Sequence, residues 1–260
     1  MIRVGIGGWN FEEWRGAFYP KGTPQAQELH FASRALTSIE INGTFYRTPS
    51  RESFVKWASE VPDGFVFSVK GPMSVIGKAV LAETGPSLDR FFSSGVLDMG
   101  AKLGPFFWQF APTKKFNAED IAAFFELLPK EASGRKLRHA VEARHASFVT
   151  PAFVDLARKH DVAIVLVDSE KHPLFADVTS DFLYLRLQNT QEKIATGYKP
   201  ADIKTWAARA KAWETGGAPD DLKAIGKAAA KKKRDVFVYF ISGAKVRAPA
   251  AAQALIKELG

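Results

Sequence analysis

Short runs of apolar residues recur along the whole chain, and most of them are continuous rather than alternating with polar residues. Eight of these runs predict β-strands, at residues 4–9, 37–42, 65–71, 106–110, 139–144, 163–169, 181–188 and 235–242. Continuous apolar runs are typical of strands that are covered on both faces. The pattern therefore favours a parallel sheet with helices packed against it.

Helical patterns lie between most of these strands. They predict helices at residues 24–36, 49–61, 87–99, 117–129, 150–160, 200–213 and 248–259, whereas the connection at 170–180 shows none. Ser50 is a plausible N-cap of the second helix, because its hydroxyl can accept a backbone hydrogen bond. Eight strands that alternate with seven helices in 260 residues predict an α/β fold, a (β/α)₈ TIM-type barrel with a parallel closed sheet. We expect it to form a single domain over residues 1–260.

A doubly wound open sheet is the alternative to the barrel. Its dinucleotide-binding form carries a G-x-G-x-x-G fingerprint after the first strand, and the chain has none there. In a barrel, the carboxyl ends of the strands carry the chemistry, because the loops that follow them build the site. The residues at these ends are therefore the candidates for function.

Polar side chains occupy the carboxyl-terminal halves of the second to seventh predicted strands. Where one strand has two of them, they are two residues apart, and the intervening positions, such as Ile41 and Leu185, are apolar. Because alternate strand residues point to opposite faces, we expect the polar set to point into the mouth of the barrel. The set consists of Glu40, Asn42, Lys70, Gln109, Glu142, Arg144, Asp168 and Arg186, with His145 just beyond the fifth strand.

Three carboxylates and three cations would meet at this mouth. Burial of each without a partner would cost several kcal/mol, so they must pair, be hydrated or hold a charged ligand. One interpretation is a salt-bridge layer that plugs the barrel; the one we favour is a ligand site. Glu40, Glu142, Asp168 and His145 could also hold a divalent metal, but the three cations would repel it. We therefore predict no metal and no other cofactor.

Aromatic residues are frequent in the loops after the first two strands. Aromatic rings on loops can stack on a ligand or pack on one another to cap the barrel. Trp9 and Tyr46 lie beside strand ends and are the better candidates for ligand contact. Trp14 and Phe18 fit the cap better.

Composition narrows the class of protein. Apolar residues make up 46% of the chain, enough for a large core, and there is no cysteine for disulfide or thiolate chemistry. No apolar run is long enough to span a membrane and no signal peptide is evident, so we expect a cytoplasmic protein. Half of the net charge of +8 comes from the basic, Ala/Lys-rich insertion at 216–234, so the total charge says little about the substrate. We expect that insertion to be solvated, at the end of the barrel opposite the site.

Several long segments give the chain a specific resemblance. "GIGGWNFEEWRGAFYP", "SIEINGTFYRTPSRESFVKWASEVPDGFVFSVKGP", "LGPFFWQFAPTKKF", "HAVEARHASF" and "ATGYKPADIKTWA" occur in this order, and together the chain resembles the YecE-like family of unknown function. The resemblance implies a TIM-type barrel and no particular activity. The family's motif positions fall on Trp9, Glu40, Asn42, Thr44, Tyr46, Lys70, Gln109, Glu142, Arg144, His145 and Asp168.

Two segments depart from the family pattern. The family usually shows a Ser/Thr-His pair after the third strand, where this chain has Ile76 and Gly77. After the eighth strand it usually shows an Asn-Asp pair and then a histidine, where this chain has Ser242, Gly243 and Arg247. Chemistry that depends on those groups would be altered here, and Arg247 would favour a more anionic ligand.

The functional hypothesis is an enzyme for an anionic, hydroxyl-bearing ligand, a sugar phosphate or a phosphodiester, with hydrolysis as one candidate reaction. Lys70, Arg144 and Arg186 would hold the anion. Glu142, or else Glu40, would act as general acid or base after a shift of its pKa toward neutrality, and Asp168 would orient or stabilise charge. Glu142→Gln is then expected to abolish activity at little cost in stability.

Two other functions are open alternatives. One is a nucleic-acid-binding protein, and the other is a non-catalytic sensor or scaffold that retains the pocket. No nucleophile motif such as G-x-S-x-G occurs, so covalent catalysis is not favoured.

Overall fold

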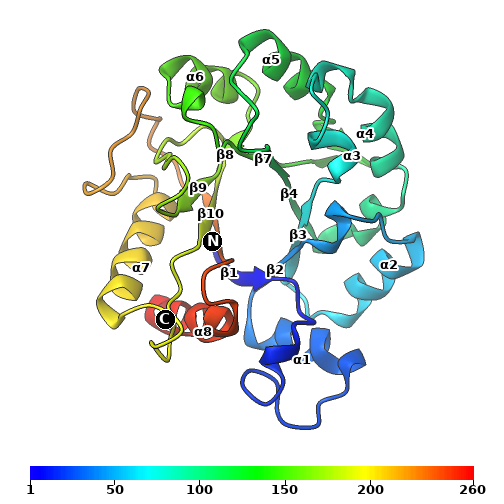
Figure 1. Cartoon of the computed structure of the whole chain (residues 1–260), viewed down its shortest axis with the longest axis vertical. Helices are drawn as coiled ribbons and strands as arrows, with labels where there is room; N and C mark the ends of the chain where they lie inside the picture. Colours follow the sequence, from blue (N-terminus) through cyan, green and yellow to red (C-terminus); the bar gives the residue numbers. More distant parts are fainter.

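A ring of parallel strands forms the centre of the protein, and helices surround it (Figure 1). The computed structural model describes residues 1–260. The strands of the ring are β1 (Ile2–Gly7), β2 (Ser38–Ile41), β3 (Val66–Lys70), β4 (Leu103–Gln109), β7 (His139–Glu142), β8 (Ala163–Ile164), β9 (Leu166–Asp168), β10 (Phe182–Leu187) and β11 (Asp235–Phe240).

The strands pair in the order β8-β7-β4-β3-β2-β1-β11-β10-β9. All eight predicted strands are present, and the order around the ring follows the sequence. The sixth predicted strand is divided into β8, which pairs with β7, and β9, which pairs with β10. The strand thus joins the two ends of the sheet, and the fold is the predicted TIM-type barrel.

The helices lie outside the ring. They are α1 (Glu28–Ala35), α2 (Arg51–Glu60), α3 (Met73–Ile76), α4 (Gly85–Phe92), α5 (Ala118–Leu127), α6 (Pro151–Lys159), α7 (Pro200–Glu214) and α8 (Ala248–Leu259). The absence of a helix between β9 and β10 is confirmed, and Ser50 caps α2 by accepting from the Ser53 amide. The predicted helix at 87–99 is wrong in its second half, because α4 ends at Phe92 and a 3₁₀ segment follows Gly95, whose φ is 95°.

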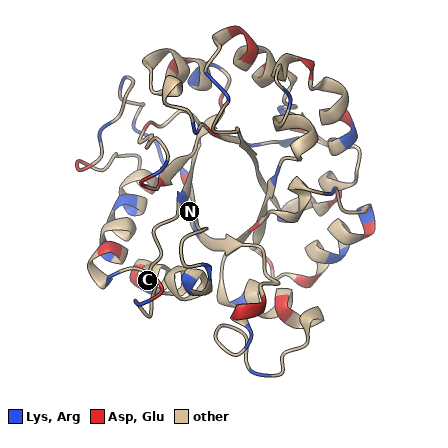
Figure 2. Ribbon diagram, viewed as in Figure 1, with Lys and Arg blue, Asp and Glu red and all other residues tan.

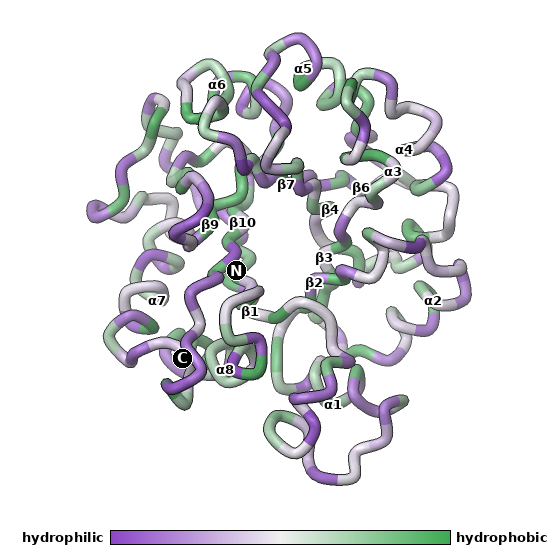
Figure 3. The backbone as a smooth tube through the Cα atoms, viewed as in Figure 1, coloured by the Kyte–Doolittle hydropathy of each residue, from purple (hydrophilic) through white to green (hydrophobic).

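Two apolar layers hold the barrel together. The larger lies between the strands and the helices and contains the outward-facing Ile39, Ile41 and Leu185, as their parity predicts. The smaller fills the barrel and includes Phe107, Tyr184 and Tyr239 among its members. Along the outer helices the backbone changes repeatedly between hydrophobic and hydrophilic residues, as expected for elements with one face on the wall and one in solvent (Figure 3).

Hydrogen bonds within the barrel support the layer beneath its mouth. The Tyr184 hydroxyl lies 2.7 Å from the Ser68 hydroxyl, and the Tyr239 hydroxyl lies 2.7 Å from the Ser38 hydroxyl. All four side chains are buried, so each hydroxyl that is withdrawn from water keeps a partner. The next inward-facing residues, two positions further along the strands, lie directly above this layer and pack on it.

The basic segment at 216–234 runs outside the ring as an irregular chain, orange in Figure 1. It contains no helix, and the Asp177 carboxylate anchors it by accepting from the amides of Ile225 and Gly226. Its last residues lead directly into Asp235, the first residue of β11. The basic tract 231–234 therefore lies at the amino-terminal end of the barrel, as predicted. In the protein as a whole, most charged residues lie on the helices and connections outside the ring (Figure 2).

No helix of the protein combines the length and the apolar character that crossing a membrane requires.

Candidate functional site

Arg186 is the centre of a charged cluster at the carboxyl-terminal mouth of the barrel. Its Nε and Nη2 atoms donate to the two oxygens of Glu40 at 3.1 and 3.2 Å, and its Nη1 donates to Glu142 Oε2 at 2.6 Å. The Tyr184 hydroxyl donates to Glu40 Oε2 at 2.6 Å from the layer below. One guanidinium therefore joins carboxylates from β2 and β7, on opposite sides of the ring.

Glu142 has no free oxygen. Besides Arg186, its Oε1 accepts from Arg144 Nε at 2.5 Å and from Gln109 Nε2 at 2.9 Å. Burial acts to raise the pKa of Glu142, but Arg186 and Arg144 outweigh it and hold that pKa below its usual value. The expectation that crowding moves the Glu142 pKa toward neutrality is wrong, because the crowding groups are cations that favour the carboxylate.

A cavity of about 300 Å³ opens above this cluster. Its wall consists of Gly7, Trp14, Asn42, Tyr46, Lys70, Gln109, Arg144, Arg186, Phe240, Ile241, Ser242, Lys245 and Ala248. Neither Glu40 nor Glu142 is part of that wall, and both are fully buried. The expected pocket is thus present, but the prediction that it touches both carboxylates is wrong, because their oxygens are turned toward Arg186.

The charge at the cavity is positive. Four cations line it, from Lys70, Arg144, Arg186 and Lys245, and the only carboxylates in contact with them are the buried Glu40 and Glu142. The cluster therefore carries two more positive than negative charges when all six groups are ionised. The wall presents cationic nitrogens and neutral amides to anything in the cavity, and no anionic oxygen.

Lys70 differs from the two arginines because no carboxylate lies within 4.0 Å of it. Its Nζ donates to Gln109 Oε1 at 2.9 Å and lies 4.4 Å from the centre of the Phe45 ring. Only 9% of the residue is exposed. Burial first, and then the nearby Arg186 charge, lower the pKa of Lys70 to about 8. Lys70 thus combines access to the cavity with an amine that is neutral in part near physiological pH.

Lys245 was not foreseen from the sequence. It lies in the 3₁₀ turn between β11 and α8, with its Nζ 4.0 Å from the centre of the Phe11 ring, and the Trp14 indole fixes the turn by donating to its carbonyl at 2.9 Å. The nearby Arg247 instead donates to the Glu192 carbonyl and does not line the cavity. The departure from the family pattern after the eighth strand indicated this turn, but it suggested Arg247 rather than Lys245 as the cation that contacts a ligand.

Ser242 also belongs to the wall and was noted only as a departure. It has a φ of 67°, a left-handed conformation that is uncommon for a residue with a side chain. Gly7 makes room on the neighbouring strand β1, since a Cβ there would lie 2.8 Å from Asn42 Nδ2. Both positions shape the cavity at the exits of β11 and β1.

The aromatic residues follow the expectation except at Trp9. Trp14 is buried and forms part of the cavity wall, whereas Trp9 packs edge-on against Trp57 of α2 and does not reach the cavity. Tyr46 lines the cavity as predicted and is 83% exposed. The first loop folds back across the mouth, where Phe11 and Phe18 pack on Trp14, so Trp14 and Phe18 form the predicted cap and Trp14 also lines the cavity.

Two predicted site residues lie away from the cavity. Asp168 was expected to complete the ring of charges, but Val167 takes the inward position on β9 and Asp168 accepts hydrogen bonds from the Tyr198 hydroxyl and Asn189, each at 2.9 Å. Burial raises the pKa of Asp168, and these two donors oppose the shift. His145 bonds to Ser147 and does not line the cavity either.

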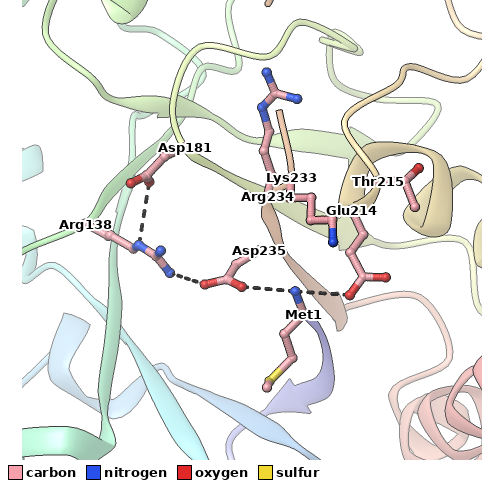
Figure 4. A pocket seen from close by; sticks show the side chains of 8 residues that line it. All are labelled: Met1, Arg138, Asp181, Glu214, Thr215, Lys233, Arg234 and Asp235. Atoms are coloured by element: carbon pink, nitrogen blue, oxygen red, sulfur yellow. Dashed lines mark hydrogen bonds and ion pairs between the residues drawn. The ribbon is translucent and has the colours of Figure 1, made fainter. Parts of the chain in front are cut away.

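A second, larger cavity of about 700 Å³ lies at the opposite end of the barrel (Figure 4). Three carboxylates line it: Asp181 and Asp235 contact Arg138, and Asp235 and Glu214 contact the Met1 amine, while Lys233 and Arg234 have no carboxylate within 4.0 Å. Residues at the amino-terminal end of such a barrel serve stability rather than chemistry. The smaller cavity lies at the strand exits, and its wall has four cations and no carboxylate, so it is the candidate functional site.

The residues considered for a metal do not come together. Glu40 and Glu142 share Arg186, while Asp168 and His145 have separate partners. No group of three or more histidine or acidic side chains is placed to hold a metal ion.

Comparisons with known proteins agree with the resemblance in the sequence. A family model described as protein of unknown function DUF72 matches residues 3–260. UPF0759 protein YecE of Escherichia coli (strain K12) is 24% identical over 151 residues, which are 57% of this chain and 50% of that protein. UPF0759 protein YunF of Bacillus subtilis (strain 168) is 24% identical over 160 residues, 60% of this chain and 55% of that protein. The chain thus matches about half the length of these curated relatives.

Two crystal structures share the fold over nearly their full length. A DUF72 family protein from Thermotoga maritima MSB8 superposes with a TM-score of 0.76 at 24% identity, covering 100% of this chain and 99% of that one. A DUF72 family protein from Enterococcus faecalis V583 superposes with a TM-score of 0.74 at 18% identity, covering 100% and 95%.

Proposed function

The chain belongs to the DUF72 family of proteins of unknown function, and we propose that this member is an enzyme that acts on a small anionic, hydroxyl-bearing ligand by acid/base chemistry. The observation that carries the proposal is the cavity at the strand exits, which is lined by four cations and by no carboxylate. A cavity of about 300 Å³ suits a ligand of the size of a sugar phosphate.

Three of the cations are suited to hold the anionic group. Arg144 and Arg186 are fixed by their carboxylate partners, so their guanidinium groups lose little freedom when a ligand binds. Lys245 lines the cavity from the turn after β11, with no carboxylate partner within 4.0 Å. A dianionic phosphate monoester would balance the excess of two positive charges, which favours a sugar phosphate over a phosphodiester with one charge.

Neutral polar groups are available for the hydroxyls of the ligand. Asn42, Gln109 and Ser242 line the same wall and can both donate and accept hydrogen bonds. Tyr46 stands exposed at the mouth and offers a ring face to an apolar side of a sugar. These groups would orient the ligand once the cations hold its charge.

Lys70 is the group best suited to move a proton. Glu142 was the first choice from the sequence, but its oxygens are occupied by two arginines and an amide, and it does not face the cavity. Lys70 faces the cavity, and burial beside Arg186 lowers its pKa to about 8. A general acid or base works best when its pKa lies near the working pH.

The test is calorimetric titration with inorganic phosphate, glucose 6-phosphate and glucose. We expect the two phosphates to bind and glucose to bind far more weakly. Lys245→Gln should weaken phosphate binding about tenfold, since a charge-assisted contact contributes about 1.5 kcal/mol or more. Lys257→Gln, the same change at the far end of α8, is the matched control and should leave binding unchanged. Equal affinities of both variants for phosphate would contradict the proposal.

A groove next to the cavity supports a second candidate, binding of a single-stranded nucleic acid. It has a volume of about 500 Å³, includes Phe45, Arg47, Met73 and Lys78, and shares Tyr46 with the cavity. Exposed aromatic rings beside cations are typical of surfaces that stack bases and contact phosphates. An oligonucleotide whose affinity falls steeply with salt and depends on Lys78 would favour this function over the small ligand.

A further inference from the structure

We propose that Lys70 is a nucleophile that forms an imine with a carbonyl carbon of the bound anion. The substrate class would then be a phosphorylated hydroxy-aldehyde or hydroxy-ketone, that is, a sugar phosphate in its open-chain form. This inference rests on the proposed function, because the same cations must hold the phosphate while Lys70 reacts.

The position of Lys70 is the first argument. It is the last residue of β3 and points into the barrel, so its Nζ is carried by a strand rather than by a mobile loop. Its one hydrogen bond is to the amide oxygen of Gln109, which leaves the nitrogen lone pair free when the amine is neutral. A side chain held on a rigid element beside a cavity is well placed for attack on a bound carbon.

The lack of a counter-ion is the second argument. Each of the two arginines at the cluster has a carboxylate within 3.2 Å, whereas Lys70 is almost completely buried with none within 4.0 Å. A buried ammonium without a carboxylate is destabilised relative to the neutral amine, and a neighbouring cation adds to this effect. Lys245 also lacks a carboxylate, but it is exposed to solvent, whereas Lys70 is buried.

The aromatic neighbours act in the opposite direction and must be weighed. Phe45 and Phe107 lie with their ring centres 4.4 and 5.7 Å from Nζ, and their ring faces favour the ammonium form. Burial and Arg186 outweigh them, and the pKa of Lys70 is lowered to about 8. At pH 7 about 9% of an amine with that pKa is neutral, against about 0.04% of an ordinary lysine.

The reaction balances without an oxidant or reductant. The neutral amine attacks the carbonyl carbon, a C–N bond forms, and the nitrogen proton passes to the carbonyl oxygen to give a carbinolamine. With a proton from solvent, the carbinolamine loses its hydroxyl group as water and leaves a protonated imine. The new positive charge lies beside the bound phosphate, which favours it.

The experiment traps the imine. The protein is incubated with glyceraldehyde 3-phosphate and sodium cyanoborohydride, which reduces an imine to a stable secondary amine, and the modified lysine is located by peptide mass spectrometry. We expect Lys70 to be modified at least about tenfold faster than the exposed Lys257, faster as the pH rises toward 8, and more slowly when inorganic phosphate competes.

Controls separate this inference from the proposed function. Lys70→Arg should lose the Lys70 adduct and keep phosphate binding, and glyceraldehyde without the phosphate should modify Lys70 more slowly than glyceraldehyde 3-phosphate does. Phosphate binding without modification of Lys70 would overturn the imine and leave the proposed function in place. If the protein neither binds phosphate nor is modified at Lys70, both the imine and the proposed function are overturned. Modification of Lys70 at the same rate with and without the phosphate group would overturn the substrate class.

Discussion

Replacement of Glu142 by glutamine is the sharpest test of the charged cluster, because the structure reverses the expectation from the sequence. From the sequence, Glu142→Gln was expected to cost little stability. In the structure, Glu142 is fully buried and accepts from Arg144, Arg186 and Gln109 at 2.5, 2.6 and 2.9 Å. A glutamine side chain has almost the same shape but no charge. Its NH₂ group, a hydrogen-bond donor, would face the N–H donors that now bind the carboxylate.

The size of the effect follows from the partners that remain. Loss of one member of a buried ion pair costs about 3–5 kcal/mol. Arg186 keeps its two contacts to Glu40, so the lower end of this range, about 3 kcal/mol, applies. For a chain of this length each kcal/mol corresponds to about 2 °C in melting temperature, so we expect a decrease of about 6 °C.

Thermal unfolding followed by circular dichroism measures the change, with Glu126→Gln on the exposed face of α5 as the matched control. The control should stay within about 1 °C of the wild type. A Glu142→Gln protein that also melts within about 1 °C of the wild type would refute the assignment of Glu142 as the buried partner of the two arginines.

The same comparison has a defined pH dependence. Burial is outweighed by Arg186 and Arg144, so the pKa of Glu142 lies below the ordinary value of 4.5. A carboxylate with a depressed pKa in the folded state stabilises the protein above its ordinary pKa, and this contribution disappears as the pH falls through the folded-state value. The difference in unfolding free energy between wild type and Glu142→Gln should thus be constant near neutrality and shrink below pH 4.5.

Three further predictions concern other parts of the barrel. Burial lowers the pKa of His139 to about 4 from 6.5, so its neutral form stabilises the fold above pH 6.5; urea unfolding should show a loss of about 2 kcal/mol between pH 7 and pH 5 that His139→Gln removes. Asn117→Ala should lower the melting temperature by about 2 °C and more than Ser50→Ala does, because Asn117 caps its helix at 2.9 Å and Ser50 at 3.4 Å; equal losses would contradict this. Glutamines at positions 231–233 should leave phosphate affinity unchanged in calorimetry, since that tract lies at the opposite end of the barrel; weaker binding with the fold intact would show otherwise.

Much of the architecture could be predicted because it depends on local patterns. The strands and the inward parity of Glu40, Lys70, Glu142 and Arg186 follow from continuous apolar runs with polar residues two positions apart. The inward face of the sixth strand could not be read from the sequence, because residues 163–167 are apolar on both faces. The structure places Ala163, Val165 and Val167 inside the barrel, so Asp168 has the outward parity.

The cavity itself depends on contacts that no local pattern contains. Arg144 and Arg186 occupy the two oxygens of Glu142, and Arg186 is distant from Glu142 in the sequence. Lys245 reaches the mouth because the Trp14 indole bonds to its carbonyl across 231 positions of sequence. Residues so far apart in the sequence come together only when the barrel closes. The residue types alone therefore predicted a charged mouth but did not show which charged groups face the cavity.

The interrupted sixth strand gives the cluster a mechanical role in addition to its electrostatic one. β8 bonds only to β7 and β9 only to β10, so the backbone ladder around the ring is broken along this one line. The 2.6 Å contact between Arg186 on β10 and Glu142 on β7 spans the interrupted strand and links the two strands on either side of it. Fluctuations that open the wall should therefore begin at this strand. In Glu142→Gln, the hydrogen-exchange rates of the amides of residues 163–168 should rise before those of the other strands in the ring. Glu142, which pairs with both arginines of the cluster, would then also keep the wall of the barrel closed.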